Sequence, residues 1–323
     1  AEVSAAGVRF AKPDIDLERL RAWKDEVIAS LGGGVGQLAA ARSVRTVVAR
    51  GALLDDHTLE LTAPDGESSR LSFDQLILAT GSLPVWPSSL AVESPLVMDS
   101  AEALGLPDVP ERLLVVGGGY IGLEMGTVYA ALGARVTVVE MAGSLLPGVD
   151  GDLVRPLSRS LAERFESIRL NTSVERLSLE DGRVSAVMVS EEHGAAAEVF
   201  DRVLVAVGRR PNSAGLGLEA AGVRVGAKGE VVVDAVGRTS CDRVLAVGDV
   251  CGGAMLAHRA TRDARRVISA LGEAGPETHS PADMLVPAVA FTDPEVAWCG
   301  SVSYTHLRAH ETRHDLVCRL LLE

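Results

Sequence analysis

Residues 112–140 read RLLVVGGGYIGLEMGTVYAALGARVTVVE, and this stretch decides the fold. Its first part, 112–116, is an apolar run that predicts a buried strand, and RVTVVE at 135–140 predicts a second strand. Between them, residues 120–133 predict a helix that ends at Gly133. The order strand, helix, strand indicates an α/β sheet.

Three glycines in this stretch form the spacing G-x-G-x-x-G: Gly117, Gly119 and Gly122. The first allows a tight turn, the second lets the backbone approach a pyrophosphate, and the third lets the helix pack close to the strand. The amides at the start of the helix then face the phosphates. The motif stands directly between a strand and a helix, and that context predicts a dinucleotide site.

Two carboxylates belong to this predicted site. Glu140 ends the second strand, roughly 20 residues after the motif, where a carboxylate accepts both adenosine ribose hydroxyls and repels a 2′-phosphate. NAD is therefore favoured over NADP. Glu124 lies one turn into the helix, and its position leaves open a solvated side chain or a contact to the nicotinamide end.

Before this stretch, residues 14–31 predict a helix that stops at the glycine run 32–34. Short strands are expected at 44–49, 57–62, 70–73 and 76–79. Thr80-Gly81-Ser82 follows the last of these strands, at the carboxyl end where α/β sheets bind ligands. Residues 83–110 are rich in proline and predict an irregular connection between domains.

After it, the pattern predicts a helix at 152–164 and a small β region, followed by another helix at 258–271. Strands are expected near 168–175, 183–190, 198–207, 230–233 and 244–247.

Composition excludes several classes of function. A net charge of −13 and a pI of about 5.1 argue against a nucleic-acid partner, and 3% aromatic residues argue against base-stacking platforms. No apolar run reaches about 18 residues, so no membrane span is expected, and no signal peptide is visible. The four cysteines have neither zinc-site nor CxxC spacing, and a cytoplasmic location is expected.

Several segments together resemble the dihydrolipoamide dehydrogenases, which are flavoprotein disulfide reductases of the pyridine nucleotide-disulfide oxidoreductase family. They are ILATGS (77–82), VPERLLVVGGG (109–119), GGGYIGLEMGTVYAALGARVTVVE (117–140), VLVAVGRRPN (203–212), VLAVGDV (244–250), AMLAH (254–258) and FTDPEVAWCG (291–300). The resemblance implies two nested, Rossmann-like dinucleotide-binding domains in an α/β fold, the FAD domain incomplete and the NAD domain complete. The FAD domain would comprise 1–110 and 236–285, the NAD domain 111–235, and 286–300 would begin a dimerisation domain.

The resemblance also implies two sets of binding residues. Those for NAD would be Gly117, Gly118, Gly119, Tyr120, Ile121, Gly122, Leu123, Glu124, Glu140, Val174 and Gly208. Those for FAD would be Gly51, Thr80, Gly81, Ser82, Asp249, Met255, Leu256, Ala257 and His258. A helix that starts near Met255 would aim its positive end at the negative charge of reduced flavin.

The implied reaction moves electrons from dihydrolipoamide to a redox disulfide, then to FAD, then to NAD+. Its partners would be dihydrolipoamide or the lipoyl domains of 2-oxo acid dehydrogenase complexes, and the intact protein would be a homodimer. The family's N-terminal G-x-G-x-x-G, its CxxxxC disulfide and its C-terminal His–Glu pair are not found in this sequence. We therefore expect an internal fragment that holds no catalytic residues and is inactive. The alternatives are another flavin disulfide reductase, of the mercuric or glutathione reductase type, and a non-catalytic NAD-binding module.

Residues 302–323, VSYTHLRAHETRHDLVCRLLLE, differ in composition from the rest of the chain. They resemble a translated sequencing adapter followed by its primer, so we expect 301–323 to be an artefactual tail. His306, His310 and His314 have helical spacing that suggests a metal site, but they belong to this tail. No metal site is expected.

Overall fold

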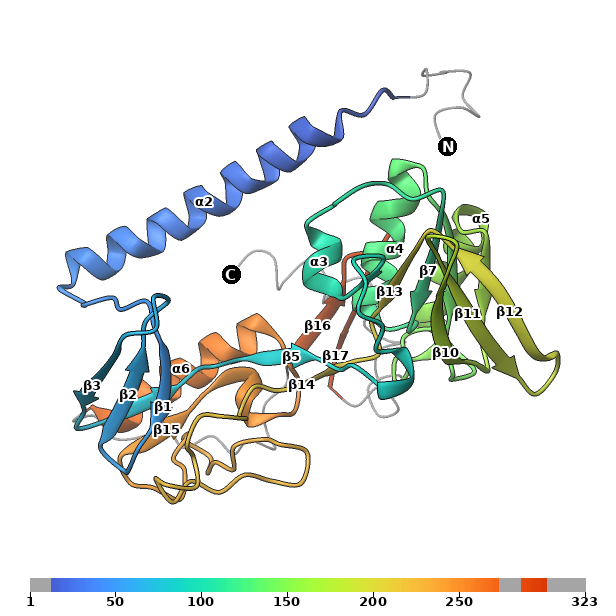
Figure 1. Ribbon diagram of the computed structural model, residues 1–323. Coiled ribbons are helices and arrows are strands. Elements are labelled where there is room, and N and C mark those ends of the chain that lie inside the picture. The colour runs from blue at the N-terminus through green and yellow to red at the C-terminus, as the bar shows by residue number, and fades with distance from the viewer. Residues whose placement is uncertain (1–12, 273–285, 301–323) are drawn as a thin grey trace, which may run out of the picture.

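The structure, a computed structural model, describes residues 13–272 and 286–300. These residues form two lobes joined by a narrow β-ribbon (Figure 1). The ribbon pairs β5 (Ser82–Pro84) with β14 (Arg209–Pro211) in antiparallel register.

One lobe is built on a five-stranded parallel sheet with the order β6-β13-β7-β8-β9. These strands are β6 (Val97–Met98), β7 (Arg112–Val116), β8 (Arg135–Val139), β9 (Ser167–Arg169) and β13 (Arg202–Val205). The helices of this lobe are α3 (Ser100–Leu104), α4 (Tyr120–Leu132) and α5 (Gly151–Arg164).

The alternation of β7 divides the core of this lobe into two layers. Leu113 and Val115 pack in one cluster with side chains of α4 and α5. Leu114 and Val116 pack on the opposite face, against a three-stranded antiparallel sheet. That sheet consists of β10 (Thr172–Glu180), β11 (Arg183–Ser190) and β12 (Gly194–Phe200). Because β7 is covered on both faces, it is apolar throughout, as parallel strands commonly are.

The other lobe combines two small sheets. Strands β1 (Arg50–Leu53), β2 (Thr58–Thr62) and β3 (Ser68–Ser72) form an antiparallel meander, and β4 (Leu76–Leu78) pairs in parallel with β15 (Val244–Ala246). The 3-10 turn η2 (Gly248–Cys251) and helix α6 (Ala257–Leu271) follow β15.

A last hairpin, β16 (Pro287–Ala290) and β17 (Val296–Cys299), packs against the parallel-sheet lobe. Ala290 and Val296 are buried in the same cluster as α4 and α5. The short 3-10 helix η1 (Ser88–Leu90) lies in the connection before β6, and its Leu90 is buried beside β10. No helix of the described residues is long and apolar enough to cross a membrane.

Most expectations around the glycine motif are confirmed. The strand at 112–116, the helix that ends at Gly133 and the strand from 135 are all present, and Gly133 adopts the left-handed conformation that closes α4. Helix α6 occupies 257–271, and α5 occupies 151–164. The predicted strands at 57–62, 183–190 and 244–247 are present within a few residues.

The expected stop at the glycine run 32–34 is wrong. Helix α2 (Leu17–Ala41) runs through these glycines, capped by Asp16, whose carboxylate accepts from the amide of Arg19 at 3.0 Å. Glycine in a helix interior costs about 1 kcal/mol relative to alanine but does not forbid the helical conformation, and the alanine-rich segment beyond it favours helix. The helix ends at Ala41 instead, with Arg42 as its C-cap residue.

Three further expectations differ from the structure. Residues 44–49 form no strand, because an apolar run pairs only where a neighbouring strand is available, and Val48 is 77% exposed. Residues 230–233 make only an isolated bridge, Val225 to Val231. The connection 83–110 is not irregular throughout, since it contains β6, the edge strand of the parallel sheet, and α3.

Residues between 216 and 231 pack with the other lobe, which does not match the expected domain boundary at residue 235. Leu218, Val223 and Val231 belong to a core cluster with Leu53 and Val244 of the other lobe. The amide of Leu53 donates to the carbonyl of Leu216 at 2.8 Å. We therefore propose a boundary close to the end of β14, at residue 211. The expected tail at 301–323 lies outside the described residues.

Candidate functional site: a dinucleotide cavity between the lobes

The glycine motif forms the turn between β7 and α4, and each of its glycines has a distinct environment. Gly117 has φ +111°, and a Cβ there would lie 2.4 Å from the carbonyl oxygen of Ala206. A Cβ on Gly122 would lie 2.3 Å from the carbonyl oxygen of Gly117. A Cβ on Gly119 would meet nothing within 4 Å. The first and third glycines are thus required by packing, whereas the second faces open space.

Helix α4 presents its first-turn amides at this open space. Gly119 is the N-cap residue, and no side chain caps the helix. Uncapped N-terminal amides and the helix dipole favour an anion at this position.

Glu140 stands beside the turn at the carboxyl end of β8 and is 7% exposed. One carboxylate oxygen accepts from the amide of Gly118 and the other from the amide of Ala142, both at 2.7 Å. Each oxygen keeps a second lone pair for an added donor. The side chain is therefore fixed in orientation and still able to accept hydroxyl groups.

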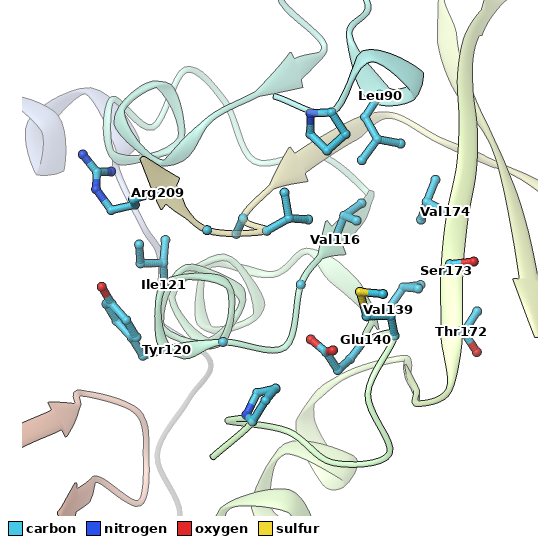
Figure 2. A pocket seen from close by; sticks show the side chains of 18 of the residues that line it. Leu90, Val116, Tyr120, Ile121, Val139, Glu140, Thr172, Ser173, Val174 and Arg209 are labelled. Atoms are coloured by element: carbon cyan, nitrogen blue, oxygen red, sulfur yellow. The ribbon is translucent and has the colours of Figure 1, made fainter. Parts of the chain in front are cut away.

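These elements surround a cavity of roughly 680 Å³. Figure 2 shows it from close by, with Glu140 and residues 172–174 on one side and Tyr120, Ile121 and Arg209 on the other. Its lining combines several parts of the chain: residues 87–90, the glycine turn and start of α4, the end of β8 with Pro147, the start of β10, the segment after β13, and Gly253 with Met255.

Seven of the residues expected to bind NAD line this cavity. They are Gly117, Gly119, Tyr120, Ile121, Glu140, Val174 and Gly208. Gly118, Gly122 and Leu123 are buried behind them. Glu124 does not line the cavity, and its carboxylate accepts from the amide of Phe291 at 2.8 Å.

Several lining residues were not found from the sequence, among them Pro87, Leu90, Thr172 and Arg209. Arg209 follows Gly208 in the segment VLVAVGRRPN, which was the only signal for it. Pro87 and Leu90 come from the connection between the lobes, and no local pattern ties that connection to the glycine turn.

The residues expected to bind FAD meet where β4 and β15 end. Ser82 donates its hydroxyl to Asp249 at 2.5 Å, and the hydroxyl of Thr80 donates to the carbonyl of Asn212 at 2.7 Å. Gly81 has φ +71° in this turn. Gly51 lies apart in sequence on β1, paired with Leu61.

The start of α6 supplies the remaining members of that set. Leu256 is its N-cap residue and makes no side-chain cap, so the first amides of α6 are free of side-chain partners. A ring nitrogen of His258 lies 2.6 Å from the carbonyl oxygen of Pro287. Met255 lines the dinucleotide cavity itself, which places the start of α6 next to it.

The cysteines of the described residues are free: Cys241 is buried, Cys251 is half-buried and Cys299 is exposed. Burial raises the pKa of the Cys251 thiol to about 12, so it stays protonated. Among the described residues, Asp55, Asp56 and His57 bring ligand atoms within 4.8 Å of one another, but they lie on the surface in the loop between β1 and β2, where such groups are common without a metal.

The fold and the cavity are those of a dinucleotide-binding α/β protein. The family described as "Pyridine nucleotide-disulphide oxidoreductase" matches residues 3–264. The chain belongs to this family. The family and its solved flavoprotein relatives imply that the whole protein uses FAD and a nicotinamide dinucleotide.

Two curated relatives of the chain are both named dihydrolipoyl dehydrogenase. Over 297 residues it is 37% identical to a dihydrolipoyl dehydrogenase of Vibrio parahaemolyticus, covering 91% of this chain and 61% of the relative. Over 296 residues it is 39% identical to one of Haemophilus influenzae, covering 91% and 60%. The chain thus spans about three fifths of the length of these curated relatives.

Two solved structures have the same fold over most of this chain. The HOCl-induced flavoprotein disulfide reductase RclA from Escherichia coli, in its Cu(II) complex, superposes with a TM-score of 0.80 at 30% identity, covering 92% of this chain and 66% of that one. LpdA from Mycobacterium tuberculosis superposes with a TM-score of 0.80 at 28% identity, covering 93% and 69%.

Proposed function

We propose that the whole protein is an NAD-dependent dihydrolipoyl dehydrogenase, which passes electrons from dihydrolipoamide through a redox disulfide and FAD to NAD+. The observation that carries the nucleotide half of this proposal is the cavity at the start of α4, with Glu140 fixed at its edge. The substrate half is supported by the relatives named dihydrolipoyl dehydrogenase, at 37–39% identity.

NAD rather than NADP follows from the charge at Glu140. Its carboxylate lies at the strand end where the adenosine ribose binds in this fold, and it can accept the ribose hydroxyls. A 2′-phosphate at the same position would bring two anions together. Among the described residues that line the cavity, Arg209 is the one cationic side chain, and it stands on the opposite side from Glu140.

The flavin lies, in this proposal, against the start of α6. FAD supplies the redox centre between nicotinamide and disulfide. The uncapped amides of α6 would favour negative charge on the reduced ring, and Met255, which lines the nucleotide cavity, would border the flavin. At the end of the β4–β15 pair Ser82 donates to Asp249 and Thr80 donates to the carbonyl of Asn212, and these side chains would meet the rest of the cofactor there.

The partners belong to the same proposal. Dihydrolipoamide, free or on the lipoyl domains of 2-oxo acid dehydrogenase complexes, is the electron donor, and the intact protein acts as a homodimer in the cytoplasm. The relatives' activity supports this assignment by analogy.

The 323-residue chain by itself is expected to be inert with lipoamide. It contains no CxxxxC pair and no second G-x-G-x-x-G for the FAD pyrophosphate. Cys251 does not ionise near neutral pH, so it cannot replace a redox thiol. The purified chain should be colourless and should not oxidise NADH with lipoamide. A yellow preparation that turns over lipoamide, and that an arsenical dithiol reagent inhibits, would contradict this expectation.

The whole protein tests the substrate assignment. It should reduce NAD+ with dihydrolipoamide far faster than it oxidises NADPH with glutathione disulfide or mercuric ion. A preference for either of those acceptors would favour another flavin disulfide reductase. That alternative has its own support, because RclA, which is described as a flavoprotein disulfide reductase, superposes with a TM-score of 0.80.

A further inference from the structure

Arg209 is the cationic side chain of the dinucleotide cavity, and its position is fixed from outside the cavity. Its Nε donates to the hydroxyl of Ser82 and its Nη2 to the carbonyl of Ser82, both at 2.8 Å. Two parallel donors of one planar guanidinium restrict its orientation. Within residues 13–272 and 286–300, no carboxylate lies within ion-pair distance of Arg209, so its charge is not neutralised by direct contact.

Arg209 marks one end of the cavity. The pyrophosphate joins the adenosine and nicotinamide halves of the dinucleotide. If it lies on the start of α4 and the adenosine ribose lies on Glu140, the nicotinamide extends from α4 away from Glu140. That end is lined by Tyr120, Ile121 and Arg209, on the side of the glycine turn away from Val174 (Figure 2). This orientation rests on the proposed function.

Other charges act at this end as well. Burial raises the pKa of Tyr120, the charge of Arg209 lowers it, and the charges of Asp249 and Glu124 raise it. Asp249 is held by the Ser82 hydroxyl, and Glu124 by the amide of Phe291. The surroundings of Tyr120 therefore contain one cation and two carboxylates, each engaged with the protein.

We propose that Arg209 is a specificity-determining residue that shifts the cavity's preference toward the reduced nucleotide. The nicotinamide ring of NAD+ carries a positive charge, whereas the dihydronicotinamide ring of NADH is neutral. A fixed guanidinium near the ring therefore opposes NAD+ and leaves NADH unaffected. The pyrophosphate is common to both, so its attraction to Arg209 cancels in the ratio of their dissociation constants.

The expected size follows from two unit charges several ångströms apart in a partly solvated cleft. Such a pair changes an equilibrium by about tenfold at an effective dielectric constant near 20–40. Asp249 and Glu124 favour NAD+, so Arg209 is the group that offsets them, and its removal should strengthen NAD+ binding relative to NADH.

The test measures the dissociation constants of NADH and NAD+ by calorimetry on the full 323-residue chain. The variant Arg209→Gln removes the charge but keeps a donor for Ser82, and Arg209→Lys keeps the charge. The matched control is Arg210→Gln, because Arg210 is the next residue, is exposed and does not line the cavity.

We expect the ratio of the NAD+ constant to the NADH constant to fall about tenfold in Arg209→Gln. It should change less than about twofold in Arg209→Lys and in Arg210→Gln. An unchanged ratio in Arg209→Gln, or an equal fall in Arg209→Lys, would overturn the proposal. If Arg209→Gln does not fold, Arg209→Met decides, because it also removes the charge with an unbranched side chain: the ratio should fall there too, and an unchanged ratio would overturn the proposal. If the unmodified chain binds neither nucleotide, the proposed function fails as well, whereas binding with an unchanged ratio removes only the role of Arg209.

Discussion

The carboxylate of Glu140 ties together two backbone amides before any nucleotide reaches it. Those of Gly118 and Ala142 both donate to it at 2.7 Å, so the residue that we propose to bind the ribose also holds the glycine turn in shape. The sequence motif predicted the first role from spacing alone. It could not reveal the second, because Ala142 follows the strand in a turn that no motif describes.

Glu140→Gln should weaken NADH binding by about tenfold and raise the affinity for NADPH relative to NADH. The glutamine amide group would face one of the two backbone N–H groups, and an unsatisfied buried donor costs about 1–3 kcal/mol. Fluorescence titration with both nucleotides measures the change. Glu163→Gln on the exposed face of α5 is the control. An unaltered ratio of NADH to NADPH affinity would remove Glu140 from the ribose site.

Within the glycine turn, Gly122 is required for packing, whereas Gly119 is free to approach a bound nucleotide. A methyl group on Gly122 would collide with the carbonyl of Gly117, whereas one on Gly119 would enter open space. Both positions have the backbone of ordinary residues, since neither has a positive φ.

Gly119→Ala should therefore impair mainly NADH binding, whereas Gly122→Ala should impair mainly the stability of the fold. Gly122→Ala should lose about 2–4 kcal/mol of stability through strain in the core. Gly119→Ala should lose less than about 1 kcal/mol as an N-cap change, but its methyl should displace the pyrophosphate and weaken NADH binding by about tenfold or more. Thermal unfolding and NADH titration of both variants give the two readings. Wild-type NADH affinity in Gly119→Ala would show that the pyrophosphate lies elsewhere.

Helix α2 shows how a local signal can mislead. Three consecutive glycines usually end a helix, yet α2 continues through 32–34, and Figure 1 shows it standing clear of the lobes over much of its length. Its attachment is at the N-terminal half, where Arg21 and Lys24 donate to backbone carbonyls at 104–107.

Gly33→Ala should stabilise α2 by about 0.5–1 kcal/mol. An added Cβ at Gly33 meets nothing within 4 Å, and its φ is not positive, so alanine gains helix propensity at no steric cost. Circular dichroism and chemical unfolding check the helix content and the stability. A loss of stability would mean that the chain leaves the helix at this run.

At the level of the two lobes, the sequence predicted the parallel-sheet lobe well because its signals are local. Strand, glycine turn, helix and strand follow one another within 112–140, so each supports the next. The other lobe was predicted less well, because Leu218 and Val231 meet Leu53 and Val244 only through long-range packing. Arg209 and Pro87 were missed at the cavity for the same reason: they reach it across the ribbon and the connection between lobes.

The packing predicts which part of the chain folds alone. Residues 95–211 contain all five strands of the parallel sheet and the antiparallel sheet that covers it. This segment should unfold cooperatively. Residues 111–235 lack β6 and add apolar residues whose partners lie in the other lobe, so they should be less stable. Equal stability, or a molten 95–211 segment, would contradict the boundary at 211.

The central claim is that this chain binds NAD(H) in the cavity at the start of α4 and discriminates against NADP(H). A single titration series on the 323-residue chain tests it most directly, with NADH and NADPH in parallel and NAD+ as competitor. The account predicts saturable NADH binding with a dissociation constant on the order of 1 μM–1 mM, displacement by NAD+, and NADPH affinity weaker by about tenfold or more. No saturable binding, or tighter binding of NADPH than of NADH, would contradict it.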